Sequence, residues 1–120
     1  ITEATWQRKH GWRTPEWKLI VALEPDFHYA PPVELYNLIK DPLELNNVAD
    51  KEPAVVKMLK ARMEKHIAKR KKACKTENPI DIAATLWNDI GRAFVSSDEA
   101  YNGMHIGDPA AAQKLQEQKK

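Results

Sequence analysis

The sequence has a single cysteine, Cys74, among 120 residues. One cysteine excludes a disulfide within the chain and a zinc site built from cysteines alone, and it leaves the redox compartment open. Long apolar runs are also absent, so no segment is a candidate transmembrane helix. Charge of one sign is not in large excess. A formal net charge of +2 is too small to indicate, by itself, a nucleic acid or an acidic membrane as partner.

Motifs that carry catalysis are missing too. The glycines form no phosphate-binding loop, and no order of Ser, His and Asp indicates a hydrolase triad. The four histidines are scattered, without the close spacing of a zinc site: His10, His28, His66 and His105. Cys74 has no nameable base or orienting partner, as a catalytic thiol would need. The sequence therefore predicts no catalytic residue and no metal ligand in this chain.

Three segments have the character of β-strands. Residues 4–13 alternate from one side to the other, as a strand does. Residues 17–23, WKLIVAL, are β-branched and apolar, and Thr14-Pro15-Glu16 between the two segments is a turn signal. Residues 33–39 predict a third strand, which Asp41-Pro42 ends because proline cannot donate to a ladder. The first two segments predict a hairpin.

The rest of the chain favours helices. Apolar residues three and four apart predict an amphipathic helix over residues 53–72, with Asp50 as its N-cap. Asn78 and Pro79 predict the start of a second helix, over residues 79–94. A short last helix is expected after Asp108-Pro109.

The predicted fold class is α+β. We expect a small antiparallel sheet of three to four strands packed against one long amphipathic helix, followed by a helical C-terminal tail. Residues 1–74 would form the sheet-and-helix subdomain and residues 75–120 the helical extension. The N-terminal sequence ITEATWQRKHGW has neither an initiator Met nor a signal peptide, and we expect the chain to be a piece of a longer protein.

The first predicted strand carries the candidate binding residues. Alternation places two aromatic rings, a cation and an imidazole on one face: Trp6, Arg8, His10 and Trp12. Such a face suits a sugar or an anionic group. The alternative is that the tryptophans belong to the core while the charged groups reach past them to solvent.

A basic run, KHIAKRKKACK, covers residues 65–75. It has the composition of a nuclear-localisation or nucleic-acid-binding patch. It also has the composition of a solvated helix end, where cations complement the helix dipole. Acidic neighbours and the small net charge favour the solvated helix end.

Two stretches resemble the C-terminal region of the sulfatase family, as in arylsulfatases and N-sulfoglucosamine sulfohydrolases. GWRTPEWKLI is similar to the family's Arg-Thr-x-x-(Trp/Tyr)-Lys hairpin, and VELYNLIKDPLELNNVADKEPAVVKMLKARME to its Glu-Leu-Tyr-(Asp/Asn)-Leu strand and the Asp-Pro-x-Glu-x-x-Asn-(Leu/Val)-Ala segment after it. The matching residues are Arg13, Thr14, Trp17, Lys18, Leu19, Ile20, Glu34, Leu35, Tyr36, Asn37, Leu38, Asp41, Pro42, Glu44, Asn47, Val48 and Ala49. The resemblance covers about residues 1–70, and residues 75–120 match no family pattern.

The resemblance implies a C-terminal subdomain that packs on a sulfatase catalytic domain and helps to wall its substrate pocket. Sulfatases hydrolyse sulfate esters, some of them N-sulfates, with a formylglycine made from a Cys/Ser-x-Pro-x-Arg motif and with a calcium ion. Cys74 is followed by Lys-Thr-Glu and does not fit that motif, and the metal-binding carboxylate motifs are absent. Formylglycine and calcium are therefore expected in a catalytic domain outside this chain, which would be inactive alone. The face of Trp6 and Trp12, or the loop over residues 24–32, would reach the pocket.

Two other functions remain open from the sequence. One is a stand-alone module that binds sulfated or otherwise anionic glycans, and the other is a basic nucleic-acid-binding module. A subdomain shaped to cover a larger partner would expose apolar surface on its own, so we also expect the isolated chain to self-associate. The sequence does not indicate a compartment.

Overall fold

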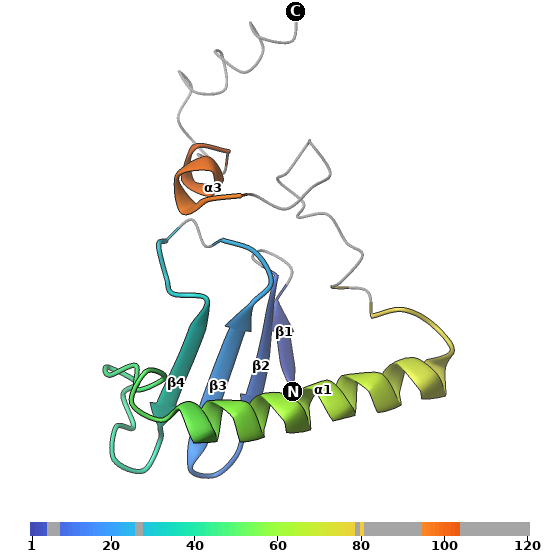
Figure 1. Cartoon of the computed structure of the whole chain (residues 1–120), viewed down its shortest axis with the longest axis horizontal. Coiled ribbons are helices and arrows are strands. Elements are labelled where there is room, and N and C mark those ends of the chain that lie inside the picture. Colours follow the sequence, from blue (N-terminus) through green and yellow to red (C-terminus); the bar gives the residue numbers. More distant parts are fainter. Residues whose placement is uncertain (5–7, 26–27, 79, 81–94, 104–120) are drawn as a thin grey trace, which may run out of the picture.

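The computed structural model describes residues 1–4, 8–25, 28–78, 80 and 95–103. Within them, four strands form one antiparallel sheet in the order β1-β2-β3-β4. A long helix, α1, lies across the strands on one face of this sheet, and a short helix, α3, lies near the end of the sheet farthest from α1 (Figure 1). The strands are β1 (Thr2–Ala4), β2 (Lys9–Arg13), β3 (Trp17–Ala22) and β4 (Val33–Asn37). The predicted α+β class, an antiparallel sheet packed on one long helix, is confirmed.

The β2–β3 hairpin has a tight turn over Thr14-Pro15-Glu16. Thr14 N–H donates to the carbonyl of Trp17 at 2.8 Å, and its Oγ1 accepts from the Trp17 N–H at 2.9 Å. Pro15 supplies the restricted φ that such a turn needs. The strands then pair in register, with Trp12 opposite Leu19 and His10 opposite Val21.

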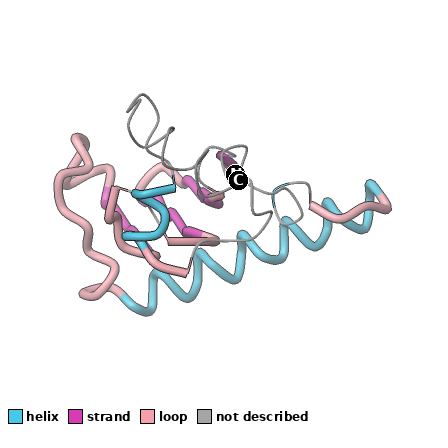
Figure 2. The backbone as a smooth tube through the Cα atoms, turned by 90° about the horizontal axis from the view of Figure 1, so that it is seen from above, coloured by secondary structure: helices cyan, strands magenta, loops and turns pink. Residues whose placement is uncertain are grey.

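The core lies between the sheet and α1 (Pro53–Cys74). Leu19 and Leu35 from neighbouring strands meet Leu59 from the helix, and all three are almost fully buried. Met63 and Ile67 continue the buried stripe along α1 at four-residue spacing, as the amphipathic pattern predicts. The C-terminal part of α1 extends past the edge of the sheet in both views (Figures 1 and 2).

The segment between β4 and α1 is held by side chains that bond to its backbone. Asn37 Oδ1 accepts from the N–H groups of Ile39 and Lys40, at 3.1 and 3.0 Å. Asp41 accepts from Leu45 N–H at 3.1 Å and from Asn46 N–H at 2.8 Å. A loop without regular structure therefore has a defined path from the strand to the helix.

Asn47 ties this hinge, residues 38–52, back to β4. Its Oδ1 accepts from Leu35 N–H at 2.9 Å and from Ala49 N–H at 3.0 Å, and its Nδ2 donates to the carbonyl of Val33 at 3.2 Å. Val48 and Ala49 then pack against the hydrophobic core. The hinge is thus bonded to the sheet edge and packed on the core at once.

Two expectations about element ends were wrong. Residues 4–13 are not one strand: β1 and β2 are separate strands that pair antiparallel, with Glu3 opposite His10. Alternation has the same period in one strand as in two successive ones, so it does not reveal a reversal between them. Asp50 is not the N-cap of α1. Glu52 holds that position with φ −125° and no side-chain cap bond, because the helix begins directly at Pro53.

The C-terminal region contains a helix that was not predicted. α3 (Ser97–Gly103) follows Ser96, whose Oγ accepts from Glu99 N–H at 3.1 Å. The Ser-x-x-Glu spacing of Ser96 and Glu99 is the sequence signature of such a start. Apart from Ile80, the predicted helix over residues 79–94 lies outside the described residues, as does the one after Asp108-Pro109.

Candidate functional site

Two of the four predicted binding residues, His10 and Trp12, lie on the face of the sheet that α1 covers. Both come from β2 and pair with residues of the core, His10 with Val21 and Trp12 with Leu19. The Trp12 ring lies 5.6 Å from the ring of His66 on α1. His10 is 6% exposed. The side chains of His10 and Trp12 therefore lie between the sheet and α1.

Arg8 precedes β2 and is engaged by a buried carboxylate. Its Nη2 lies 3.3 Å from Oε2 of Glu24, and its backbone N–H donates to Oε1 of the same side chain. The Glu24 side chain is only 3% exposed, and that of Arg8 14%. An ion pair this deep loses hydration on both sides, so removing one partner would leave an uncompensated buried charge. Arg8 thus positions the strand end. Trp6, the fourth predicted residue, lies outside the described residues.

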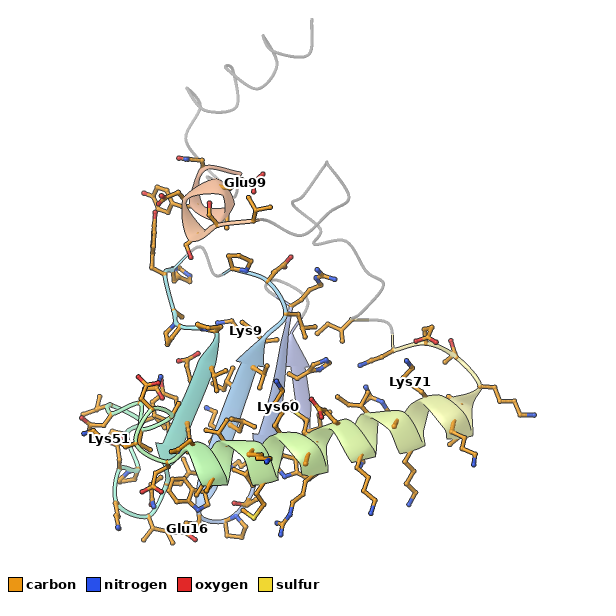
Figure 3. All side chains as sticks on the ribbon, in the orientation of Figure 1. Lys9, Glu16, Lys51, Lys60, Lys71 and Glu99 are labelled. Atoms are coloured by element: carbon orange, nitrogen blue, oxygen red, sulfur yellow. The ribbon has the colours of Figure 1, made fainter. Side chains whose placement is uncertain are left out.

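A groove of about 580 Å³ opens between the sheet and α1, next to His10. Its size falls within the range of small-molecule sites. It is lined from the sheet by His10, Val21, Ala22 and Leu23, and from α1 by Lys60, Met63, Glu64, Ile67, Ala68 and Lys71. Figure 3 shows Lys60 and Lys71 on the edge of α1 nearest the sheet.

The groove combines an apolar floor with polar groups at its margin. Met63, Ile67 and Val21 form the floor, while two ammonium groups and the Glu64 carboxylate line its helix side. This arrangement suits an apolar body with an anionic or hydroxyl-bearing end. Within the part of the chain that the structure describes, no cluster of three or more His, Cys, Asp or Glu side chains could hold a metal ion. No Ser, Thr or Cys is among the lining residues of the groove, so no hydroxyl or thiol nucleophile lines it.

A second, smaller cavity of about 350 Å³ belongs to the loop over residues 24–32. Its lining residues are Ala22, Leu23, Glu24, Pro25, Ala30 and Pro32. The loop also contacts α3: Tyr29 donates its hydroxyl to Asp98 at 2.6 Å and lies 6.1 Å, ring to ring, from Tyr101. The hydrogen bond to Asp98 raises the pKa of Tyr29 above its usual 10.0. This loop therefore joins the sheet to the C-terminal region.

The hinge forms a third feature, with about 340 Å³ of open volume beside the β2–β3 turn. It is lined by Glu16, Trp17, Asn37, Lys40, Asp41, Asn46, Val48, Lys51 and Glu52. Hydrogen bonds from Leu45 and Asn46 hold the pKa of Asp41 below its usual 3.8. Nearby on β4, burial and a 2.7 Å hydrogen bond to Glu34 raise the pKa of Tyr36 to about 12. Both side chains therefore keep their usual charge at neutral pH.

The hinge and the β2–β3 hairpin meet through Lys18 and Glu44. Lys18 Nζ lies 2.6 Å from Oε2 of Glu44, and both side chains are about one-third exposed. Leu38 N–H donates to the carbonyl of Glu16 at 2.7 Å close by. Lys18 and Glu44 belong to the two separate stretches that resemble sulfatases. The two stretches thus make one structural unit.

Sequence reasoning missed the helix side of the groove and the partner of Arg8. Glu24 follows an apolar strand and precedes Pro25, and nothing in its neighbourhood marks it as the residue that pairs with Arg8. Lys60, Glu64 and Lys71 have the spacing of one helix flank, since Glu64 follows Lys60 by four residues and Lys71 follows Glu64 by seven. This spacing indicates that the three residues share one flank of α1, but it does not indicate that this flank faces the sheet.

No family model, no curated protein and no solved structure matches this chain. Among the helices that the structure describes, none is long and apolar enough to span a membrane.

Proposed function

We propose that this chain is the C-terminal subdomain of a sulfatase-like hydrolase, which acts on sulfate esters or N-sulfates. The subdomain packs on a catalytic domain and forms part of the wall of the substrate pocket. The sulfuric ester hydrolysis belongs to the whole enzyme. The chain alone has no nucleophile of the formylglycine type, because its one cysteine, Cys74, is exposed and followed by Lys-Thr-Glu.

The observation that carries this proposal is the convergence of the two sulfatase-like stretches. Lys18 from one pairs with Glu44 from the other. Asn47 bonds the hinge to β4, and Val48 and Ala49 pack on the core. These positions of the family pattern thus make specific contacts that hold the fold together. Such contacts favour a fold shared with the family over residues 1–70, rather than a chance likeness of two short motifs.

The groove beside His10 supports the pocket-wall part of the proposal. It is open on one side, and its margin carries Lys60 and Lys71. Ammonium groups at the rim of an apolar recess suit the anionic end of a sulfated substrate. Placing this groove, and the nearby loop over residues 24–32, against a catalytic domain would complete a closed pocket. His10 and Trp12 then act mainly by fixing the shape of the wall, and no residue of this chain is assigned to formylglycine or calcium.

The experiment is a comparison of two polypeptides on an aryl sulfate. The 120-residue chain should show no turnover, while the polypeptide extended upstream of Ile1 by its own coding sequence should hydrolyse the ester. Cys74→Ser in both is the matched control, and it should change neither result, since this thiol is not the nucleophile.

Turnover by the 120-residue chain well above the blank would overturn the proposal. An extended polypeptide that folds and shows no sulfatase activity with any aryl sulfate or N-sulfated sugar would also count against it.

A further inference from the structure

Helix α1 carries a large excess of positive over negative charge. Between Pro53 and Cys74 it has eight lysine or arginine residues and one glutamate, whereas the whole chain has a net charge of only +2. The rest of the chain is therefore net acidic. This separation of charge gives one element a strongly positive surface while the total charge stays small.

Four of these cations form a single row. Arg62, Lys65, Lys69 and Lys72 follow each other at three- and four-residue spacing, which keeps them on one flank of the helix. All four side chains are exposed. At a rise of about 1.5 Å per residue the row is roughly 15 Å long, with neighbours about 4.5–6 Å apart along the axis. We call it the basic row.

The basic row lies apart from the groove and the core. The buried stripe of α1 consists of Leu59, Met63 and Ile67, and Lys60 and Lys71 lie on the other flank, beside the groove. Figure 3 shows nitrogen-tipped side chains along the edge of α1 that points away from the sheet. The C-terminal half of the helix also extends beyond the sheet (Figure 1). A long partner could therefore lie along this flank without meeting the sheet.

Within the described part of the chain, no carboxylate neutralises the charges of this row. Among the described residues, none of the four makes an ion pair, whereas Lys18 and Lys71 elsewhere are paired with Glu44 and Glu77. Four like charges on one flank repel each other and reduce helix stability by a few tenths of a kcal/mol per close pair. A bound polyanion would relieve this repulsion.

We infer that the basic row binds a linear sulfated glycan, and that this glycan is the polymer whose sulfate groups the complete enzyme removes. The choice of a sulfated glycan among polyanions rests on the proposed function. The row is straight and regularly spaced, so it fits a polymer with an anionic group on nearly every ring. A single phosphate would instead need donors that converge on one point.

The same surface is poorly suited to a single-stranded nucleic acid. Binding of single strands relies on aromatic side chains that stack with bases. Within α1 only His66 has an aromatic ring, and this ring lies 5.6 Å from that of Trp12. The row therefore offers charge without a stacking platform, which suits a polymer that is held through its sulfate groups.

The test is the affinity of the 120-residue chain for heparin oligosaccharides as a function of salt. The row variant changes four residues to glutamine: Arg62→Gln, Lys65→Gln, Lys69→Gln and Lys72→Gln. The control removes the same charge from exposed cations off the row and away from the groove: Arg13→Gln, Lys40→Gln, Lys51→Gln and Lys57→Gln. Glutamine has nearly the helix propensity of lysine, so both variants should fold, which circular dichroism checks.

The row variant should lose at least about tenfold in affinity at 0.1 M salt, and the slope of log K against log salt should fall by roughly three. The control should stay within about threefold of the parent. Equal losses in the two variants would overturn the inference, because binding would then follow net charge alone.

Single-stranded DNA of matched charge gives the second arm. We expect the chain to bind this DNA more weakly than heparin, and DNA binding as tight as heparin binding would overturn the inference. These outcomes are separate from the sulfatase proposal. If heparin binding does not depend on the row but the extended polypeptide is an active sulfatase, only the inference about the row is overturned. If the extended polypeptide has no sulfatase activity, the proposed function is overturned, even when the row binds heparin selectively.

Discussion

Lys18 and Glu44 lie 26 residues apart in the chain, and their charged atoms lie 2.6 Å apart in the structure. Glu44 takes φ 57°, a left-handed conformation that costs a residue with a Cβ about 1–2 kcal/mol. Its N–H donates to the carbonyl of Asp41 at 3.0 Å. The ion pair and this turn bond offset the backbone cost and fix the hinge against the β2–β3 hairpin.

The coupling between Lys18 and Glu44 should be measurable but small. In a double-mutant cycle with Lys18→Met and Glu44→Gln, we expect a coupling free energy of about 0.2–1 kcal/mol, because both side chains are about one-third exposed. Urea unfolding at low salt measures it, and about 1 M salt should reduce it by screening. A coupling of zero at low salt would show that the contact does not hold the hinge.

Asn47 should contribute more than the ion pair. Asn47→Ala removes three hydrogen bonds to the backbone of β4 and the hinge, and we expect a loss of about 1–3 kcal/mol in the free energy of unfolding. Asn102→Ala is the matched control, since Asn102 is exposed on α3. Similar losses in both variants, measured by urea unfolding, would contradict this role.

Asp41 should make stability depend on pH in the acid range. Its folded pKa lies below the usual 3.8, so its contribution is present above that value and is lost as the pH falls through the lower folded pKa. Asp41→Asn should therefore flatten the decline in the urea midpoint below about pH 4 while leaving the slope near neutral pH unchanged. Parallel curves for the two proteins across the acid range would refute it.

Leu35 should be a main determinant of folding. It is 0% exposed beneath α1, and Leu35→Ala should cost about 2–5 kcal/mol through lost burial and the cavity left behind. Leu45→Ala, at a hinge position that is 75% exposed, should change stability by no more than about 0.5 kcal/mol. Thermal and urea unfolding of the two variants measure both changes. Similar losses of stability in the two variants would contradict a specific role of Leu35 in core packing.

The sheet and the long helix could be predicted from the sequence because their patterns are local. Apolar spacing placed α1 within two residues of its actual end, and the turn residues placed the β2–β3 hairpin. The division of residues 4–13 into β1 and β2 could not be predicted, because alternation continues through a reversal that no Gly, Pro or Asn marks. Because residues 4–13 are not one continuous strand, their alternation does not establish that Trp6 and Trp12 share a face of the sheet.

The candidate site was predictable only in part. Alternation put His10 and Trp12 on one face, and the structure shows that this face is turned toward α1. Which face of a strand a helix covers depends on contacts far apart in the sequence, and the pairing of Arg8 with Glu24 depends on them as well. Whether His10, Arg8 and the tryptophans meet a substrate remains a prediction.

We propose that residues 1–70 form the end of a sulfatase-like enzyme, and the decisive measurement is the coding sequence upstream of Ile1. We expect an in-frame Cys/Ser-x-Pro-x-Arg motif some hundreds of residues before Ile1, in a polypeptide that hydrolyses a sulfate ester. An upstream reading frame that is closed, or that is open and lacks this motif, would contradict it.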